Sequence, residues 1–203
     1  GRNAGWLVGA TALARQEDCD GPDLIYLPEV PFDIETFVER VTGLLEKKDV
    51  IVAAVSEGIR TADGAYVCEL ADGAHSKDAF GHIQMTGTAS YLAGLVHERL
   101  GIKTRAVELS TLQRAAAHLA SRVDVDEAFA VGGATVKAAD EGSSGVMVVI
   151  DRVSDDPYQS AIGVYDVHRI ANGEKLVPRS WINAAGDYVT DEFVSYVKPL
   201  IQG

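Results

Sequence analysis

The sequence predicts an α/β fold, in which a mostly parallel sheet carries helices on both faces. Strand-like apolar runs alternate along the chain with segments of helical spacing, which is the order that parallel strands and their crossover helices require. The strand-like runs, such as Val50–Val55 and Val146–Ile150, are continuously apolar. A strand has this pattern when both faces of its sheet are covered.

The first quarter of the chain predicts a helix, a strand, a second helix and a second strand. Trp6–Arg15 has apolar residues at helical spacing, and Leu24–Leu27 is a short apolar run closed by a proline. Asp33 is expected to be the N-cap of a helix that continues to Leu45. Lys47–Lys48 would lie in its last turn, where cations favour the helix dipole. The apolar run that ends at Val55 follows as the second strand.

The rest of the chain is less regular but keeps the same alternation. Residues 59–81 contain two Asp-Gly pairs, at 63–64 and 72–73, and predict a hairpin-like excursion at the surface. The later expected elements are a helix at Thr88–Leu100 stopped by Gly101, a strand at Thr104–Leu109, a helix that begins in a capping box of Asp124 and Glu127 and runs to Asp140, a strand at Gly145–Asp151, and a short helix at Asp191–Val197.

Composition excludes several kinds of partner. The chain has 203 residues with 18 Lys and Arg against 30 Asp and Glu, so its formal net charge is −12. This charge argues against nucleic acid and against anionic membrane surfaces. The sequence contains no stretch apolar enough for a membrane span and no signal peptide. Cys19 and Cys68 form no paired motif, so a reducing, cytoplasmic compartment is expected.

The candidate binding site is the edge of the sheet where the strands end. Ligands of open α/β sheets collect outside the carboxyl ends of the strands. Polar residues follow three of the predicted strands, at Pro28-Glu29, Ser56–Gly58 and Ser110–Arg114, and Arg2 is expected to join them. Carboxylates bind sugar hydroxyls, and arginine binds phosphate through two parallel hydrogen bonds. The alternative is that Glu29 and Glu57 are solvated loop residues.

The common catalytic motifs are missing from the sequence. It has no GxxxxGK[ST] loop, no GxGxxG after a strand, no HExxH and no GxSxG elbow, and its five histidines lack metal-ligand spacing. The residues alone therefore predict a polar, partly anion-binding rim, and they do not identify a reaction.

Several segments resemble the phosphofructokinase family, in the order in which that family has them. Gly1–Leu7 is similar to the end of the family's Met-Gly-Arg motif and the small-residue helix after it, and Leu27–Glu29 to its strand-ending Pro-Glu. The further matches are Val52–Gly58, which resembles the strand ending in the sugar-binding Glu, Phe80–Gln84, which resembles the Phe-Gly-His segment, Leu112–Arg114, which resembles the Leu-Gln-Arg block, and residues 178–203, which are similar to the tail of the pyrophosphate-dependent bacterial branch.

This resemblance implies a 6-phosphofructokinase, a phosphotransferase of glycolysis. Such an enzyme phosphorylates the 1-hydroxyl of fructose 6-phosphate with Mg²⁺, and the tail favours pyrophosphate over ATP as the donor. Gly1 and Arg2 would line the junction of sugar and transferred phosphoryl group, with Arg2 as the catalytic residue, and Glu57 would accept hydrogen bonds from the sugar hydroxyls. The residues implied around the 6-phosphate are Arg105, Thr111, Leu112, Gln113 and Arg114.

Two of these implications have alternatives. The family often donates the counterpart of Arg105 to a neighbouring subunit, so a homo-oligomer is expected; otherwise Arg105 is a solvent-facing residue at the start of a strand. Thr111 stands where the family has Tyr or His, Ala115 where it has Gly or Ser, and Met85 lies in a segment where it has Gly-Gly. These departures favour a second hypothesis, a non-catalytic regulatory subunit whose site has decayed. An unrelated α/β sugar-phosphate-binding module is a third.

The family's Gly-Gly-Asp donor loop and Thr-Ile-Asp catalytic segment precede Met-Gly-Arg and do not occur in this sequence. The donor site, the general base and the Mg²⁺ ligands are therefore expected in a further amino-terminal part, with no metal ligands in these residues. Residues 1–114 would form the sugar-phosphate-binding lobe. Residues 115–203 would form a crossover helix, a strand and a tail that return to the amino-terminal domain. Their apolar faces would otherwise be exposed or drive association.

Overall fold

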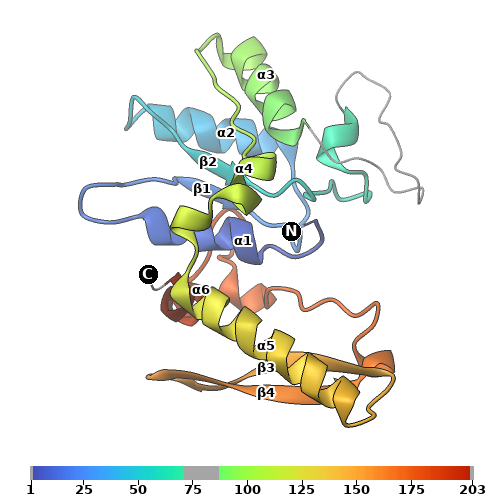
Figure 1. Ribbon diagram of the computed structural model, residues 1–203. Helices are drawn as coiled ribbons and strands as arrows, with labels where there is room; N and C mark the ends of the chain where they lie inside the picture. The colour runs from blue at the N-terminus through green and yellow to red at the C-terminus, as the bar shows by residue number, and fades with distance from the viewer. Residues whose placement is uncertain (1, 71–86, 202–203) are drawn as a thin grey trace. The chain divides into compact units, whose positions relative to one another are not determined.

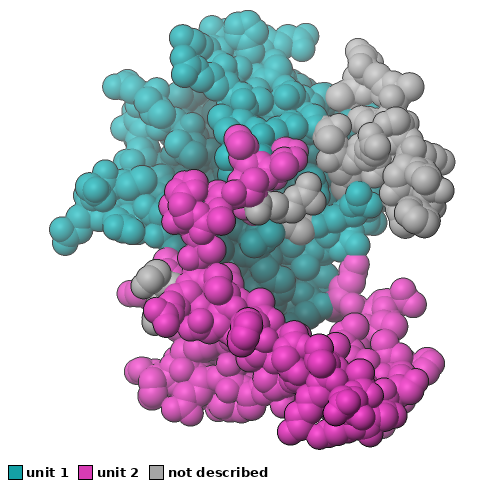
Figure 2. Space-filling view, viewed as in Figure 1, with its two compact units in different colours: residues 1–109, 175–194 teal, residues 110–174, 195–203 magenta. Residues whose placement is uncertain are grey.

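The computed structural model describes residues 2–70 and 87–201, and the chain forms two compact units. Unit 1 comprises residues 1–109 and 175–194, and unit 2 comprises residues 110–174 and 195–203 (Figure 2). This division differs from the predicted boundary after residue 114. The chain leaves unit 1 at Leu109 and returns to it, because Val177, Ile182 and Phe193 are buried in unit 1.

The sheet of unit 1 consists of two parallel strands. β1 (Leu24–Tyr26) pairs with β2 (Ala53–Val55), and Ile25 lies opposite Ala54. Figure 1 shows α2 and α3 on one side of these strands and α1 on the other. The predicted α/β class, with parallel strands and helices on both faces, is therefore confirmed.

Two helices of unit 1, α2 and α3, begin and end where the sequence predicts. α2 (Ile34–Leu45) starts at Asp33, whose carboxylate accepts a hydrogen bond from the Thr36 amide at 2.7 Å. α3 (Thr88–Leu100) ends at Gly101, which has a φ of 67° in the left-handed region. The core between these helices and the sheet consists of Leu24, Tyr26, Phe32, Phe37, Val38, Val41, Ile59, Val67, Leu92 and Val96.

The first helix covers the other face of the sheet. α1 (Trp6–Gly9) is a single turn that continues as a 3₁₀ helix at Ala10–Ala14, so the predicted helical segment is present but shorter in α-form. Trp6 stacks on Phe193 with ring centroids 5.8 Å apart, and the edge of Trp181 meets Trp6 at 6.1 Å. Phe193 is fully buried, so this aromatic cluster joins the first helix to the returning segment.

The predicted role of Lys47–Lys48 at the end of α2 is wrong. The helix ends at Leu45, so neither lysine belongs to its last turn. The Lys48 ammonium instead lies 2.5 Å from the Asp23 carboxylate and 2.7 Å from Asp20. Asp23 also accepts a hydrogen bond from the Val52 amide at 2.8 Å, so this ion pair joins the segments that lead into β1 and β2.

The hairpin-like excursion is present in its first half. Arg60 and Tyr66 form an antiparallel bridge, and Gly64 has a φ of 90° at the turn between them. A 3₁₀ helix at Val67–Leu70 follows and buries Val67 and Cys68. The second Asp-Gly pair, at 72–73, lies outside the described residues.

The strand predicted at Thr104–Leu109 does not form. These residues pair with no strand of the described chain, and the Thr104 hydroxyl donates instead to the Ala93 carbonyl of α3 at 2.9 Å. The segment leads into α4 (Ser110–Ala115) and a 3₁₀ helix at Ala117–Leu119. The Leu-Gln-Arg block is therefore helical and does not follow a strand.

Unit 2 is built from one long helix and an antiparallel hairpin. α5 (Arg122–Asp140) lies along β3 (Val146–Asp155) and β4 (Tyr158–Asp166) in Figure 1. β3 extends the strand expected at Gly145–Asp151, but its partner is β4, which we had not predicted, and the pairing is antiparallel. A 3₁₀ helix at Val167–Arg169 follows.

The predicted capping box of α5 is also wrong. The helix begins at Arg122, with Ser121 as its N-cap in place of Asp124. Glu127 does not return to the helix start, because its carboxylate accepts a hydrogen bond from the Tyr158 hydroxyl of β4 at 2.5 Å. The outward face of α5 carries apolar residues with large exposed fractions, 84% for Phe129 and 71% for Val136. This agrees with the expected exposure of its apolar face.

The end of the chain follows the prediction closely. A 3₁₀ helix at Arg179–Trp181 leads to α6 (Asp191–Val197), with the predicted bounds, and to a 3₁₀ helix at Lys198–Ile201. Among the helices of residues 2–70 and 87–201, none is long and apolar enough to cross a membrane.

Candidate functional site

Two of the three predicted strand ends meet at one edge of the sheet. Because β1 and β2 are parallel neighbours in register, their carboxyl ends place Leu27–Glu29 beside Ser56–Gly58. The Ser56 amide donates to the Tyr26 carbonyl at 3.0 Å, which continues the pairing one residue beyond the strands. Glu57, between the buried Ser56 and Gly58, is exposed at this edge.

The segment that carries Arg2 lies directly against this edge. A Cβ built on Gly58 would lie 1.5 Å from the Arg2 carbonyl oxygen, so the two backbones touch and position 58 accepts only glycine without displacement. The Arg2 side chain is half-buried. The structure therefore brings Arg2 next to the Glu57–Gly58 segment, as the rim hypothesis requires.

Glu29 is half-buried and is neither a solvated loop residue nor an open rim carboxylate. Its Oε1 accepts hydrogen bonds from the Gly5 amide at 2.8 Å and the Val177 amide at 2.9 Å. Its Oε2 is inaccessible to solvent. The expectation that Glu29 faces the ligand is thus corrected: both oxygens are turned into the protein, where the carboxylate joins three segments of the chain.

The remaining candidate residues lie elsewhere or outside the described chain. Arg105 is exposed, in the irregular segment that ends unit 1. Gly1 and the Phe80–Gln84 segment lie outside the described residues. Thr111, Leu112 and Gln113 are exposed on α4, which belongs to unit 2 and also contains Arg114. The structure thus brings together Arg2 and Glu57, both in unit 1, while the Leu-Gln-Arg block stands in the other unit.

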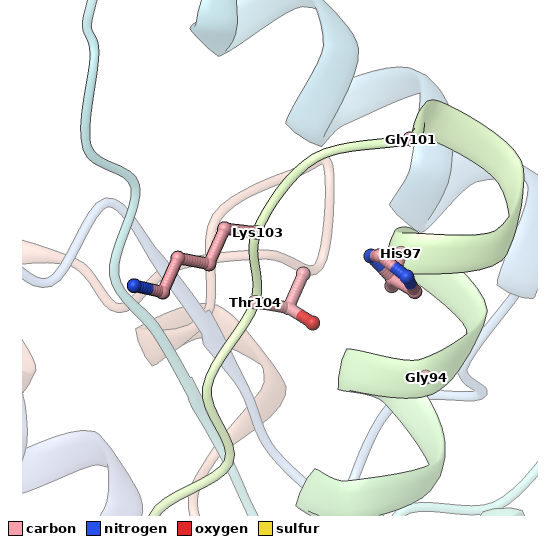
Figure 3. Close-up of a pocket in the computed structure, with 5 residues that line it drawn as sticks. All are labelled: Gly94, His97, Gly101, Lys103 and Thr104. Carbon is pink, nitrogen blue, oxygen red and sulfur yellow. The ribbon is translucent and has the colours of Figure 1, made fainter.

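One pocket of about 500 Å³ lies at the carboxyl end of α3. It is lined by Gly94, His97, Gly101, Lys103 and Thr104, and in Figure 3 the Lys103 side chain points away from His97. His97 Nδ1 is 2.7 Å from the Ile102 carbonyl oxygen, so this ring nitrogen is engaged by the backbone. No residue of the predicted site lines this pocket, and we do not assign the substrate to it.

Cys68 offers no nucleophile close to this edge. It is fully buried, and burial raises the pKa of its thiol above the ordinary value. A raised pKa keeps the thiol protonated at neutral pH, and the thiolate is the reactive form. The charged side chains at this edge are therefore those of Arg2 and Glu57.

Comparison with known proteins decides the family. Residues 1–139 match the family model described as phosphofructokinase. The chain belongs to the phosphofructokinase family. It is 42% identical over 203 residues to proteins named pyrophosphate–fructose 6-phosphate 1-phosphotransferase from Halomonas elongata and Xanthomonas campestris. Each alignment covers 100% of this chain and 48% of the relative.

A solved phosphofructokinase has the same fold. The crystal structure of the pyrophosphate-dependent phosphofructokinase from Marinobacter aquaeolei matches with a TM-score of 0.82 and 34% sequence identity. The match covers 100% of this chain and 46% of that one. The resemblance drawn from the motifs is confirmed, and the chain spans about half the length of the phosphofructokinases that it matches.

Sequence reasoning missed the residues that hold the phosphofructokinase motif segments in place. Trp6 donates its indole N–H to the Lys175 carbonyl at 2.6 Å, and the Val177 amide donates to Glu29. Both contacts join residues more than 140 positions apart, which no local pattern encodes. Gly58 was the available sequence signal for the contact with Arg2, since a glycine after a strand is consistent with the close approach of another backbone.

Proposed function

We propose that this chain is the sugar-phosphate-binding part of a pyrophosphate-dependent 6-phosphofructokinase. The single observation that carries the proposal is the contact of the Arg2 backbone with Gly58, beside Glu57, at the carboxyl edge of β1 and β2. It is supported by the 42% identity, over the whole chain, to relatives named for transfer from pyrophosphate to fructose 6-phosphate.

Each candidate residue has a role in this proposal. The sugar hydroxyls donate hydrogen bonds to the Glu57 carboxylate, and Gly1 and Arg2 line the position of the 1-hydroxyl. The Arg2 guanidinium stabilises the negative charge that develops as the phosphoryl group is transferred. Arg114, with Thr111, Leu112 and Gln113 around it, binds the 6-phosphate through charge-assisted hydrogen bonds. Arg105 reaches the phosphate of a neighbouring subunit, so the working protein is a homo-oligomer of the cytoplasm, acting in glycolysis.

Among the residues that the structure describes, magnesium has no cluster of candidate ligands. The described residues include no group of three or more His, Cys, Asp or Glu side chains that could hold a metal ion. The residues present therefore do not fit the Mg²⁺ that the family resemblance implies, and the roles proposed for them are confined to the sugar phosphate.

A second candidate function is a non-catalytic phosphofructokinase-like subunit. Thr111 and Ala115 favour it, because they differ from the residues that the family has beside the 6-phosphate arginine. Thr111 stands in place of Tyr or His, and Ala115 stands in place of Gly or Ser. A short hydroxyl reaches less far than a Tyr or His side chain. A subunit of this kind would keep the fold and lose saturable sugar-phosphate binding.

The test is calorimetric titration of the chain with fructose 6-phosphate. Saturable heat is expected, and Glu57→Ala and Arg114→Ala should each weaken binding by about 1.5–3 kcal/mol, the usual contribution of a charge-assisted hydrogen bond. Glu46→Ala is the matched control, because Glu46 is an exposed carboxylate just after α2. No saturable heat with the unmodified chain would support the second candidate.

Turnover is tested in a hybrid protein. The chain is fused to the half of the Halomonas elongata relative that it does not cover, and fructose 1,6-bisphosphate formation is assayed with pyrophosphate and with ATP. Formation with pyrophosphate supports the proposal. Formation with ATP alone would correct the donor, and no product with either donor, despite sugar-phosphate binding, would reject the catalytic assignment.

A further inference from the structure

The carboxylate of Glu29 lies at the junction of three chain segments in unit 1. Its Oε1 accepts hydrogen bonds from the Gly5 amide (2.8 Å) and the Val177 amide (2.9 Å), while Oε2 is shielded from solvent. Glu29 itself follows β1 at the edge of the sheet. A carboxylate that directs both oxygens inward and bonds only backbone amides is not placed to contact a ligand.

Val177, the second amide donor to Glu29, belongs to a segment that also contacts Trp6. The Trp6 indole donates to the Lys175 carbonyl at 2.6 Å, and the Lys175 ammonium lies 5.9 Å from the centre of the Trp6 ring. Residues 5–6 and 175–177 are therefore joined twice, once through Glu29 and once directly. Both contacts require residues 175–177 to be packed against unit 1.

The short segment from Arg2 to Gly5 is consequently held at both of its ends. Its Arg2 carbonyl lies against Gly58, where a Cβ would approach to 1.5 Å, and its Gly5 amide is bound by Glu29. Gly5 also packs closely, since a Cβ at that position would lie 2.6 Å from the Leu27 side chain and 2.7 Å from Glu29 Oε2. Four residues fixed in this way leave the Arg2 Cα little freedom to move.

We propose that Glu29 is a positioning residue for Arg2. By accepting the Gly5 and Val177 amides on one oxygen, it fixes the Arg2–Gly5 segment against the Glu57–Gly58 edge and so sets the origin of the Arg2 side chain. This inference rests on the proposed function for its effect on sugar-phosphate binding, but the holding of the segment is independent of that function. A guanidinium displaced by about 1 Å stabilises a reacting group much less.

The contacts distinguish this role from that of a ligand or a base. Both amides bind the same oxygen, so the amide oxygen of glutamine can replace it, and negative charge is not required. Glu29→Gln should therefore retain the arrangement. Glu29→Ala removes the acceptor and leaves two amides without it. A residue that bound sugar or moved a proton through its carboxylate would lose its function in both variants.

The experiment compares Glu29→Ala and Glu29→Gln in the 203-residue chain, with Val41→Ala as control. Val41 belongs to α2 and is buried in the core, so its truncation lowers stability without touching the Arg2 segment. Amide hydrogen exchange by NMR is expected to accelerate about tenfold or more at Gly5 and Val177 in Glu29→Ala. It should stay within about threefold of the unmodified chain in Glu29→Gln and in Val41→Ala. Trp6 fluorescence should change only in Glu29→Ala.

Calorimetry with fructose 6-phosphate gives the second readout. Affinity should fall about tenfold or more in Glu29→Ala and should be retained in Glu29→Gln and Val41→Ala. Unchanged exchange at Gly5 and Val177 in Glu29→Ala would overturn the proposal, as would a Glu29→Gln variant that behaves like Glu29→Ala, or an undiminished affinity in Glu29→Ala. If the unmodified chain does not bind fructose 6-phosphate, the proposed function fails, and the exchange rates alone then decide whether Glu29 holds the segment.

Discussion

Replacing Gly58 by alanine tests how closely the Arg2 segment must approach the edge of the sheet. Gly58 does not have a positive φ, so alanine is compatible with its backbone conformation. Alanine is disfavoured at position 58 only because its Cβ would overlap the Arg2 backbone. The added Cβ would lie 1.5 Å from the Arg2 carbonyl oxygen and 2.7 Å from its carbonyl carbon, both of which are backbone atoms.

The size of the effect follows from this overlap. Ordinary van der Waals contact begins near 3.4 Å, so one of the two backbones must move by roughly 2 Å. Inserting one methyl group into a packed site costs about 1–3 kcal/mol of stability. A movement of this size at Arg2 should also weaken fructose 6-phosphate binding by about tenfold or more.

Urea unfolding followed by tryptophan fluorescence measures the stability, because both tryptophans belong to the aromatic cluster of unit 1. Gly43→Ala is the matched control. Gly43 lies inside α2 with no atom within 4 Å of a built Cβ. Alanine at an open helix interior should raise the free energy of unfolding by about 0.5–1 kcal/mol.

The same substitution should therefore have opposite signs at the two positions. The reasoning is refuted if Gly58→Ala is as stable as the unmodified chain and binds fructose 6-phosphate equally well. A loss of stability with undiminished binding would show that Gly58, and not Arg2, yields to the added methyl group.

Three further outcomes are expected. Burial, together with the hydrogen bond to Glu127, raises the pKa of Tyr158 to about 12, above the value of about 10 in an unfolded chain. The unfolded state then loses this proton first, so the free energy of unfolding should fall between about pH 10 and pH 12. Urea titrations of Tyr158→Phe should show a smaller slope, and the remaining slope comes from Tyr26 and Tyr165, whose pKa values are also raised. Phe193→Ala removes a fully buried ring between Trp6 and Trp181 and should cost about 3–5 kcal/mol, with a shift in tryptophan emission; a cost below about 1 kcal/mol would contradict the packing described. Phe129→Ser should lower concentration-dependent association in sedimentation experiments while leaving the urea midpoint nearly unchanged, because Phe129 is 84% exposed.

The elements with strong local signals are those that the sequence predicted. α2 and α3 have apolar stripes, an N-cap at Asp33 and a stop at Gly101, all of which act within one or two turns. β1 and β2 are continuous apolar runs that fit a sheet covered on both faces. Their parallel pairing brings the segments of Glu29 and Glu57 to one edge, which the sequence predicted, while the place of Arg2 depends on its backbone contact with Gly58.

The errors share a cause, which is a tertiary contact that the local sequence pattern does not encode. Thr104–Leu109 has strand-like composition, but a strand needs a neighbour, and the Thr104 hydroxyl bonds to α3. The spacing of Glu127 from Asp124 fits a capping box, but its carboxylate accepts a hydrogen bond from Tyr158 of β4 instead. Glu29 has the composition of a loop carboxylate, yet one of its donors is 148 residues away. Propensity cannot rank such contacts, because tertiary structure decides them.

The course of the chain through the two units also orders events during synthesis. The core around Leu24 and Val96 is complete once the chain has been synthesised and released from the ribosome up to Ile102. Lys175, Val177 and Phe193 are synthesised after this core, so Glu29 and Trp6 lack these partners until then. Until residues 175–193 have been synthesised, a nascent chain would thus hold a folded core with an unsecured Arg2 segment.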